Sequence, residues 1–384
     1  MSLVLDQVSK RVTGSLHIDQ VSLTLEPGTF NVLLGRTLAG KTSLMRLMAG
    51  LDKPSSGQVL MNGQDVTRTP VQKRNVAMVY QQFINYPSLT VYDNIASPLK
   101  LAGLDPSSID RKVREAAEML HIEKLLERLP GELSGGQQQR TAIARALVKD
   151  AALLLFDEPL VNLDYKLREE LRAELREIFQ TREAIVVYAT TEPQEALTLG
   201  GRVVVLHEGR VLQHGPTLEV YHHPASLTVG EVFSDPPLNH VSGVVEPGTL
   251  LLGHDLKLAP LGHLARLAPG RYTFGIRANH LSVRRQSEAD VAVRAEAELA
   301  EISGSETYIH VRYGHDNWVL QEEGVHEYRL GDEVTVYFDP RHLFVFDLHG
   351  ILVAAPQRGV VHEATAAATA RTIGLHRVAD GSEG

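Results

Sequence analysis

The sequence contains no cysteine among its 384 residues. Disulfide bonds and thiolate metal sites are therefore excluded, and the composition suits a reducing compartment. No apolar run reaches the roughly 18 residues that a membrane-spanning helix needs, so we expect no such helix. The first residues lack a basic start followed by an apolar stretch, and we expect no export signal.

An excess of positive charge is also lacking, because the net charge is −9. This balance argues against non-specific nucleic-acid binding as the main role. The 17 histidines are scattered, without a His-x-x-x-His pair on a convincing helix, so we expect no histidine metal site. Hydrophobic residues make up 43% of the chain and charged residues 22%. These shares are typical of a globular protein, and the length predicts two or three structural units.

The first two thirds of the chain alternate strand and helix patterns. Short strands and turns occupy residues 3–34, including a loop over Lys10–Gly14, and a helix is predicted over 43–49. The remaining predictions here are a helical insertion over about 88–150, buried strands over 151–156 and 184–189, and a charged amphipathic helix over 166–180. Strands alternating with helices favour a mostly parallel sheet that is covered on both faces.

The pattern changes after Asp235, where Pro236 and Pro237 mark a boundary. Short strands then alternate with glycine and proline turns, which predicts a smaller all-β, barrel-like domain. Its expected strands include 272–277, 307–313, 332–338 and 343–347. We therefore divide the chain into an α/β domain over 1–235, a β-rich domain over 236–350 and a flexible tail over 351–384, in which a short helix near 363–371 is an alternative.

A glycine-bearing loop follows the strand 31–34. The segment Gly35-Arg36-Thr37-Leu38-Ala39-Gly40-Lys41-Thr42 fits G-x-x-x-x-G-K-[ST], and a helix follows it through Ser43, the context that this motif requires. Successive backbone N–H groups and a helix N-terminus make an anion site. Lys41 can reach the terminal phosphates of a nucleotide, and the Thr42 hydroxyl can ligate Mg²⁺. The alternative is a glycine turn without a ligand.

Two acids end the apolar strand 153–156. Ionised groups at a buried edge are costly without a cation, and a Mg²⁺–nucleotide supplies one. Asp157 is therefore predicted to hold Mg²⁺, and Glu158 to orient or deprotonate an attacking water. The alternative is a strand that ends at a solvated turn.

A third segment, together with these two motifs, indicates a protein family. Leu133-Ser134-Gly135-Gly136-Gln137 resembles the LSGGQ signature of ABC-type ATPases, and it lies between the other two motifs as that family requires. The resemblance covers residues 1 to about 350. It implies an α/β P-loop ABC ATPase domain with a helical insertion, followed by an OB-like TOBE domain of the carbohydrate-importer type. The motifs 275–281 and 338–340 are similar to segments of that TOBE domain.

The resemblance also implies roles for individual residues. Gln81 matches the Q-loop glutamine, which contacts Mg²⁺ and the attacking water, and Asp164 matches the D-loop. Ser134 offers a hydroxyl and the two glycines offer N–H groups that bind the γ-phosphate held by a partner ATPase. The residues expected to contact nucleotide are Gly35, Arg36, Thr37, Leu38, Ala39, Gly40, Lys41, Thr42, Ser43, Ser134, Gly135, Gly136, Gln137 and Asp164.

Two positions depart from the family pattern. Thr191 stands where a histidine normally contacts the γ-phosphate, and threonine cannot carry a proton charge at neutral pH. The aromatic that normally stacks on adenine is replaced by Val12 or Thr13. Both departures affect the site on this chain's own phosphate loop, so we favour pairing with a second, non-identical ATPase. A homodimer in which threonine is tolerated is the alternative.

The resemblance further implies partners and a location. These are two permease subunits, whose coupling helices enter a groove near 83–87, and indirectly a solute-binding protein, at the cytoplasmic face of a bacterial inner membrane. Segments 70–92 and 156–170 are similar to the ATPases of glycerol-type importers, so glycerol is the favoured solute, with another sugar or polyol as the alternative. Roles on DNA or ribosomes, and ATP sensing with little turnover, are competing hypotheses, and we expect no nucleic-acid partner.

Overall fold

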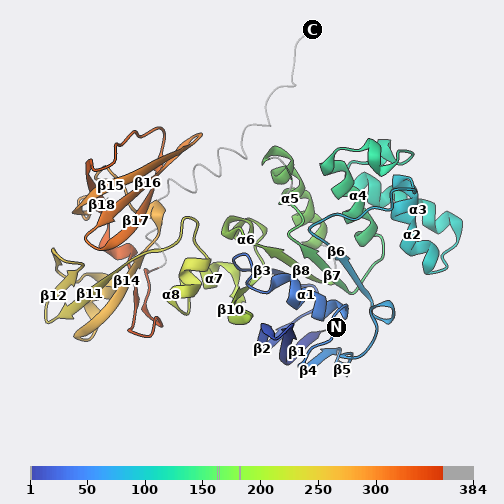
Figure 1. Cartoon of the computed structure of the whole chain (residues 1–384), viewed down its shortest axis with the longest axis horizontal. Helices are drawn as coiled ribbons and strands as arrows, with labels where there is room; N and C mark the ends of the chain where they lie inside the picture. Colours follow the sequence, from blue (N-terminus) through green and yellow to red (C-terminus); the bar gives the residue numbers. More distant parts are fainter. Residues whose placement is uncertain (1, 162, 164, 181–182, 358–384) are drawn as a thin grey trace, which may run out of the picture. The chain divides into compact units, whose positions relative to one another are not determined.

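The computed structural model describes residues 2–161, 163, 165–180 and 183–357. The chain forms two compact units (Figure 1). The first comprises residues 1–225 and 229–235, and the second comprises 226–228 and the chain from 236 onward. The predicted short helix near 363–371 lies outside the described residues. No helix in the described part of the chain is long and apolar enough to cross a membrane.

A six-stranded sheet organises the first unit, in the order β10-β9-β3-β8-β7-β6. Five of its strands run parallel, and β10 pairs antiparallel with β9. The strands are β3 (Phe30–Leu34), β6 (Val76–Val79), β7 (Leu153–Asp157), β8 (Ile185–Thr190), β9 (Arg202–His207) and β10 (Arg210–Pro216). The predicted buried strands at 151–156 and 184–189 are therefore present, each displaced by one or two residues.

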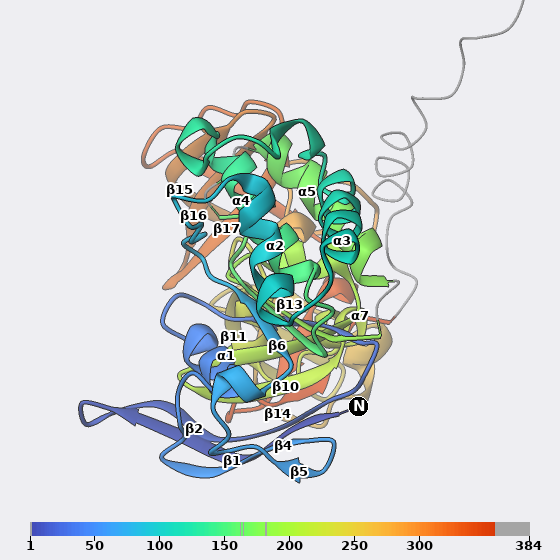
Figure 2. The same ribbon diagram turned by 90° about the vertical axis from the view of Figure 1, so that its right-hand side faces the viewer.

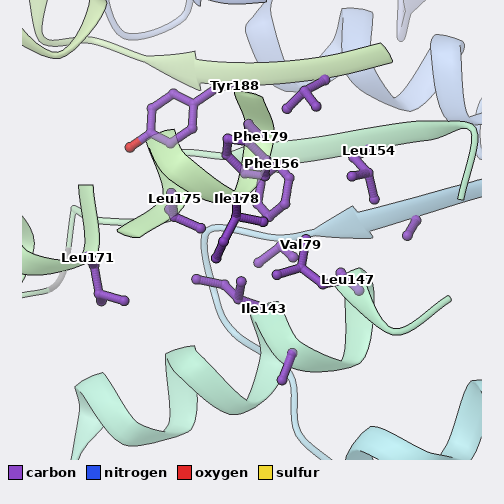
Figure 3. Close-up of a cluster of buried hydrophobic side chains, with 14 of the residues drawn as sticks. Val79, Ile143, Leu147, Leu154, Phe156, Leu171, Leu175, Ile178, Phe179 and Tyr188 are labelled. Carbon is purple, nitrogen blue, oxygen red and sulfur yellow. The ribbon is translucent and has the colours of Figure 1, made fainter. Parts of the chain in front are cut away.

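The central strands are apolar on both faces because each face meets a separate core. On β7, Leu153 and Leu155 belong to one cluster of buried residues, whereas Leu154 and Phe156 belong to the other. Figure 3 shows the second cluster, in which Phe156 packs with Phe179, their ring centroids 5.0 Å apart. The helices of the unit are α1 (Lys41–Ala49), α2 (Val91–Leu101), α3 (Pro106–Met119), α4 (Gly135–Leu147), α5 (Tyr165–Gln180), α6 (Pro193–Leu199) and α7 (Thr217–His222), and α8 (Leu227–Val232) crosses the boundary.

A smaller antiparallel sheet of order β2-β1-β4-β5 completes the first unit. Helices α2, α3 and α4 and this sheet lie at opposite ends of the unit (Figures 1 and 2). The predicted loop over Lys10–Gly14 is wrong, because Lys10, Arg11 and Val12 pair with the next strand and only Thr13 and Gly14 turn. Both turn residues have positive φ, 46° and 89°, which matches the twist of a tight hairpin. The strands are β1 (Leu3–Val12), β2 (Ser15–Leu25), β4 (Ser56–Met61) and β5 (Gln64–Asp65).

The described part of the second unit consists of two antiparallel sheets around one core. The sheets have the orders β13-β12-β11-β14-β19-β20 and β17-β16-β15-β18. Trp318, the single tryptophan of the chain, is 2% exposed between Tyr313 and Phe338. This is the predicted all-β domain, although several strands were not anticipated. The strands are β11 (Asn239–Glu246), β12 (Thr249–Leu252), β13 (Leu256–Leu258), β14 (Gly270–Ile276), β15 (Val291–Ser303), β16 (Glu306–Tyr313), β17 (Asp316–Glu323), β18 (Glu333–Phe338), β19 (Phe344–Phe346) and β20 (Leu352–Ala354).

Candidate active site

Four parallel strands end at one edge of the central sheet and place the predicted residues there. The loop from Gly35 follows β3, Thr191 follows β8, Glu158 follows β7, and Gln81 lies two residues beyond β6. Because β3, β8, β7 and β6 are neighbours in that order, these segments meet along a continuous edge. The carboxyl ends of parallel strands are where ligands bind in open α/β sheets.

The phosphate loop turns sharply between β3 and α1. A side chain at Gly35 would place its Cβ 2.5 Å from the carbonyl oxygen of Leu206. Gly40, the residue before α1, has φ 105°, which only glycine adopts readily. Leu38 also has positive φ, 66°, and its side chain is 96% exposed. Arg36, Thr37 and Thr42 are exposed, Ser43 is half-buried and Ala39 is buried.

Lys41 is held below this loop. Its ammonium donates hydrogen bonds to the carbonyls of Gly35, at 2.8 Å, and Arg36, at 3.2 Å. It also lies 3.1 Å from Oε1 of Glu158. The Lys41 side chain is 5% exposed and that of Glu158 is 16% exposed. A cation and an acid are thus held together under the loop where phosphates were predicted to bind.

Glu158 connects three of the converging strands. Gln81 Nε2 donates to its Oε2 at 3.4 Å, and its own backbone N–H donates to the carbonyl of Ala189 at 3.1 Å. Its φ is 45°, a left-handed conformation that is uncommon outside glycine. Strained backbone of this kind concentrates at functional sites. The conformation turns the chain directly after Asp157.

Asp157 is buried, with 4% exposure, at the end of β7. Burial raises the pKa of its carboxyl, a hydrogen bond from Thr42 acts in the opposite direction, and the neighbouring charge of Glu158 adds to the rise. A buried acid beside a hydroxyl is an oxygen donor pair that suits Mg²⁺, which needs only one or two protein ligands beside phosphates and water. Among the described residues there is no cluster of three or more His, Cys, Asp or Glu that could hold a metal by itself.

The signature segment forms the start of α4. Ser134 is the N-cap residue, its hydroxyl accepting from the Gln137 N–H at 3.4 Å while its own N–H donates to Gln137 Oε1 at 3.1 Å. The two glycines differ in their surroundings. A Cβ at Gly135 would meet only the Phe83 ring, at 4.0 Å, whereas one at Gly136 would lie 2.2 Å from Cδ2 of Leu167 on α5. Gly135 therefore has open space around its Cα, whereas Gly136 packs closely against the side chain of Leu167.

The other residues singled out in the sequence lie at the surface, are partly buried or fall outside the described residues. Thr191 is half-buried in the bend after β8, while Asp164 lies outside the described residues. Val12 is 37% exposed at the hairpin tip, beside Leu16 at 40%. The groove segment near 83–87 carries Ile84 and Tyr86, which are 60% and 48% exposed.

Sequence reasoning missed two residues that hold segments following the central strands in place. Asn94 is fully buried on α2 and hydrogen-bonds the backbone of Tyr86, Leu89 and Thr90. Arg168 on α5 binds Glu192, directly after Thr191. The pattern of α5 gave no signal for this contact, because regularly spaced charges on a helix also fit a solvated face.

Comparison with known proteins decides the family. The ABC transporter family model matches residues 18–161, and the TOBE domain model matches 274–346. The trehalose/maltose import ATP-binding protein MalK of Thermococcus litoralis is 39% identical over 350 residues, which are 86% of this chain and 93% of that protein. This chain belongs to the ABC transporter ATP-binding family.

Other relatives agree with this assignment. The oligosaccharides import ATP-binding protein MsmX of Bacillus subtilis is 35% identical over 338 residues, covering 86% of this chain and 93% of that protein. Among solved structures, a dimeric post-hydrolysis state of the ATP-binding cassette MJ0796, bound to ADP and Pi, matches with a TM-score of 0.51 and 27% identity. That match covers 56% of this chain and 98% of the cassette. The predicted fold class, a P-loop ABC ATPase domain followed by a TOBE domain, is confirmed.

Proposed function

We propose that this chain binds and hydrolyses ATP as a subunit of an ABC importer that takes up a sugar or polyol. The observation that carries the proposal is the cluster of Lys41, Glu158 and Gln81 next to the Thr42–Asp157 pair, at the edge where the phosphate loop opens. These groups match the needs of phosphoryl transfer, in which catalysis consists of positioning and charge stabilisation.

Each residue of the cluster has a separate task in this proposal. The phosphate loop and Lys41 bind the β- and γ-phosphates, and Glu158 accepts a proton from the attacking water that Gln81 helps to orient. Thr42, Asp157 and Gln81 would hold Mg²⁺, which would neutralise developing phosphate charge. When phosphate arrives, Lys41 exchanges its contact with Glu158 for the nucleotide, and the carboxylate becomes free to act as a base.

The exposed signature supports a two-subunit site. The Ser134 hydroxyl and the N–H groups of Gly135 and Gly136 lie at the start of α4, and Gly135 is open to contact from outside the chain. We infer that they bind the γ-phosphate held by a partner ATPase. The MJ0796 cassette is a dimer in its solved structure, which supports such an arrangement.

The relatives bear on the transported solute. MalK is named a trehalose/maltose import ATP-binding protein and MsmX an oligosaccharides import ATP-binding protein. The second unit of this chain matches the TOBE domain model. We therefore propose a carbohydrate importer with two permeases and a solute-binding protein, and this chain at the cytoplasmic face of the inner membrane. Glycerol, favoured by the resemblance in segments 70–92 and 156–170, is the narrower form of the proposal.

Thr191 supports the proposal that this chain pairs with a different ATPase. Threonine donates a hydrogen bond but has no titrating proton near neutral pH, so the site on this chain's phosphate loop is expected to turn over slowly. A partner that keeps a histidine would supply the faster site, and this chain lends it an intact signature.

The proposal is tested by purifying the tagged chain from native membranes and identifying every co-purifying chain by mass spectrometry. Two permeases and a second, histidine-bearing ATPase are the expected result. Permeases without a second ATPase would contradict the unequal pair but keep the importer. Ribosomal or nucleic-acid partners without permeases would overturn the proposal. Uptake of glycerol, maltose and trehalose by proteoliposomes of the purified complex then distinguishes the solutes.

A further inference from the structure

The chain on either side of Thr191 is anchored to α5. After Thr191, the Glu192 carboxylate accepts a hydrogen bond from Arg168 Nη1 at 2.7 Å. Before it, the Thr190 hydroxyl donates to Glu195 Oε2 at 2.5 Å, and Arg172 Nη2 lies 3.4 Å from Glu195 Oε1. Arg168 and Arg172 are four residues apart and therefore project from the same face of the helix.

Thr191 has no such anchor of its own. Within the part of the chain that the structure describes, its hydroxyl has no hydrogen-bond partner. Its position follows from its two neighbours, since a residue between two fixed peptides has little freedom. The 190–192 segment is therefore placed by two hydrogen bonds from backbone N–H groups, Gly35 N–H to Thr190 O at 3.3 Å and Glu192 N–H to Thr190 Oγ1 at 3.0 Å, and by side chains of α5 and α6. The Thr191 side chain does not contribute to its placement.

Arg168 also contacts the chain that leads into α5. Its Nη2 donates to the carbonyl of Leu163 at 3.4 Å. Leu163 and Leu167 are the two side chains that a Cβ at Gly136 would meet, so this start of α5 packs on the signature helix. One guanidinium thus joins the segment that packs on the signature to the segment that carries Thr191.

One donor of this arginine is left unsatisfied within the described part of the chain. Its Nε is buried and has no hydrogen-bond partner among the described residues, as is also true of Arg172. A buried donor without a partner is destabilising, and such departures are expected where function requires a particular group. Side-chain exposures of 22% for Arg168 and 36% for Glu192 leave the ion pair only partly screened by water.

We propose that Arg168 is a positioning residue for Thr191. Its bond to Glu192 fixes Thr191 at the edge of the sheet where the phosphate loop lies. Its contact with the start of α5 links that position to the signature helix α4. The inference rests on the proposed function, because it assigns Thr191 a contact with the transferred phosphoryl group. Arg168 itself touches neither nucleotide nor water. Its effect on hydrolysis is carried by the 190–192 backbone.

The test uses the complete transporter complex and compares Arg168→Met, Glu192→Leu and the double variant. Each single change is expected to lower kcat about tenfold at the site on this chain's phosphate loop, because a small displacement of a group that acts in the transition state has effects of this size. The KM for ATP is expected to stay within about twofold, since ground-state binding rests on the phosphate loop. The double variant should be no slower than either single one, which identifies a shared interaction.

Two further variants complete the design. Glu192→Gln keeps the acceptor oxygen and is expected to retain most of the activity. Arg176→Met changes an exposed arginine on the same helix and should have no effect. Hydrogen exchange should quicken at the amides of 191 and 192 in Arg168→Met, while exchange in the 84–90 segment stays unchanged.

Additive effects of the two single changes, or a lower Tm with unaltered kcat and unaltered exchange, would overturn the inference. If Arg168→Met fails to fold, Glu192→Leu and Glu192→Gln measure the same bond from its other end. Failure of the proposed function is distinguished by the parent complex: a parent that does not hydrolyse ATP refutes the function. A parent that does, and loses activity in Glu158→Gln but not in Arg168→Met, refutes the positioning role alone.

Discussion

The Lys41 ammonium and the Glu158 carboxylate lie 3.1 Å apart, so the proposed phosphate-binding cation and the proposed base neutralise one another in this conformation. Both groups are at least four-fifths buried, which makes the attraction stronger than at a surface. Nucleotide phosphates that bind Lys41 would compete with Glu158 for it. The pair therefore couples nucleotide arrival to release of the base.

The Glu158→Gln variant is expected to bind ATP but to hydrolyse it about 100- to 1,000-fold more slowly at the site on this chain's phosphate loop. Glutamine keeps the size and hydrogen bonding of the side chain but cannot accept the proton of water. Phosphate release and ATP binding, measured on the same preparation of the complex, check the two parts. Glu183→Gln changes an exposed acid just before β8 and should have no effect. Hydrolysis within threefold of the parent at that site would contradict the assignment of the base.

Asp157→Asn is expected to raise the stability of the nucleotide-free chain at neutral pH. Burial raises the pKa of Asp157 above its value in the unfolded chain, so ionisation opposes folding. The penalty is absent below the unfolded pKa, develops as the pH rises from there through the folded pKa, and persists above it. The gain in Tm should therefore shrink as the pH is lowered from 7 toward the unfolded carboxyl range.

The same variant should lose its response to the metal. Removing one carboxylate ligand is expected to reduce Mg²⁺-dependent hydrolysis about 10- to 100-fold. Thermal unfolding with and without Mg²⁺ and ATP, at several pH values, measures both effects. A variant that is less stable than the parent at pH 7 without nucleotide would show that Asp157 has a favourable partner as a carboxylate.

Thr191→His is expected to increase ATP turnover in the assembled complex, by up to about a hundredfold at the site on this chain's phosphate loop. A histidine adds a charged or titrating donor toward the γ-phosphate, a contact made in the transition state. Thr191→Asn, which adds a donor without a titrating proton, serves as the control. Turnover that is unchanged by histidine would contradict the idea of a weakened site.

Asn94→Ala is expected to loosen the 86–90 segment without changing ATP binding. The buried amide accepts from the Tyr86 N–H and donates to the carbonyls of Tyr86, Leu89 and Thr90 at 3.0–3.1 Å. Loss of this set should destabilise the segment by about 2–3 kcal/mol, since one buried side chain meets four backbone groups. Hydrogen exchange of these amides measures the effect, and Asn279→Ala, at an exposed asparagine, is the control.

Asn94→Ala is also expected to weaken the association of this chain with the permease subunits. Ile84 and Tyr86 are exposed on the segment that Asn94 holds, and Arg145 lies over the Tyr86 ring at 5.0 Å. If Asn94→Ala leaves both hydrogen exchange and the yield of intact complex unchanged, the anchoring role of Asn94 is wrong.

The central sheet could be predicted from the sequence because its signals are local. An apolar strand, a glycine loop and a helix occur within 31–49, and a short apolar run ends in Asp157 and Glu158. Strand limits were displaced by one or two residues because burial of a strand end depends on its neighbours. The loop at Lys10–Gly14 was wrong because pairing with β2 extends β1 to its turn.

Strand β15 illustrates why the second unit was harder to predict. Its buried positions Val293, Ala295 and Ala297 alternate with arginine and glutamate. Alanine and glutamate are strong helix formers, so only the pairing with β16 and β18 makes this segment a strand. Arg168 was missed for a similar reason, since its partner Glu192 is 24 residues away and nothing local distinguishes the arginine from a solvated one.

The order of the central strands has a consequence for biosynthesis. Strand β8 lies between β3 and β7, although it follows both in the chain. The glycine loop and Asp157 are synthesised before the strand that joins their two halves of the sheet. A nascent chain that ends before residue 190 therefore contains the separate parts of a nucleotide site. It lacks β8, so the edge of the sheet that would bind the nucleotide is incomplete. A nucleotide that needs the completed edge would bind, and so stabilise, only a chain whose sheet has closed.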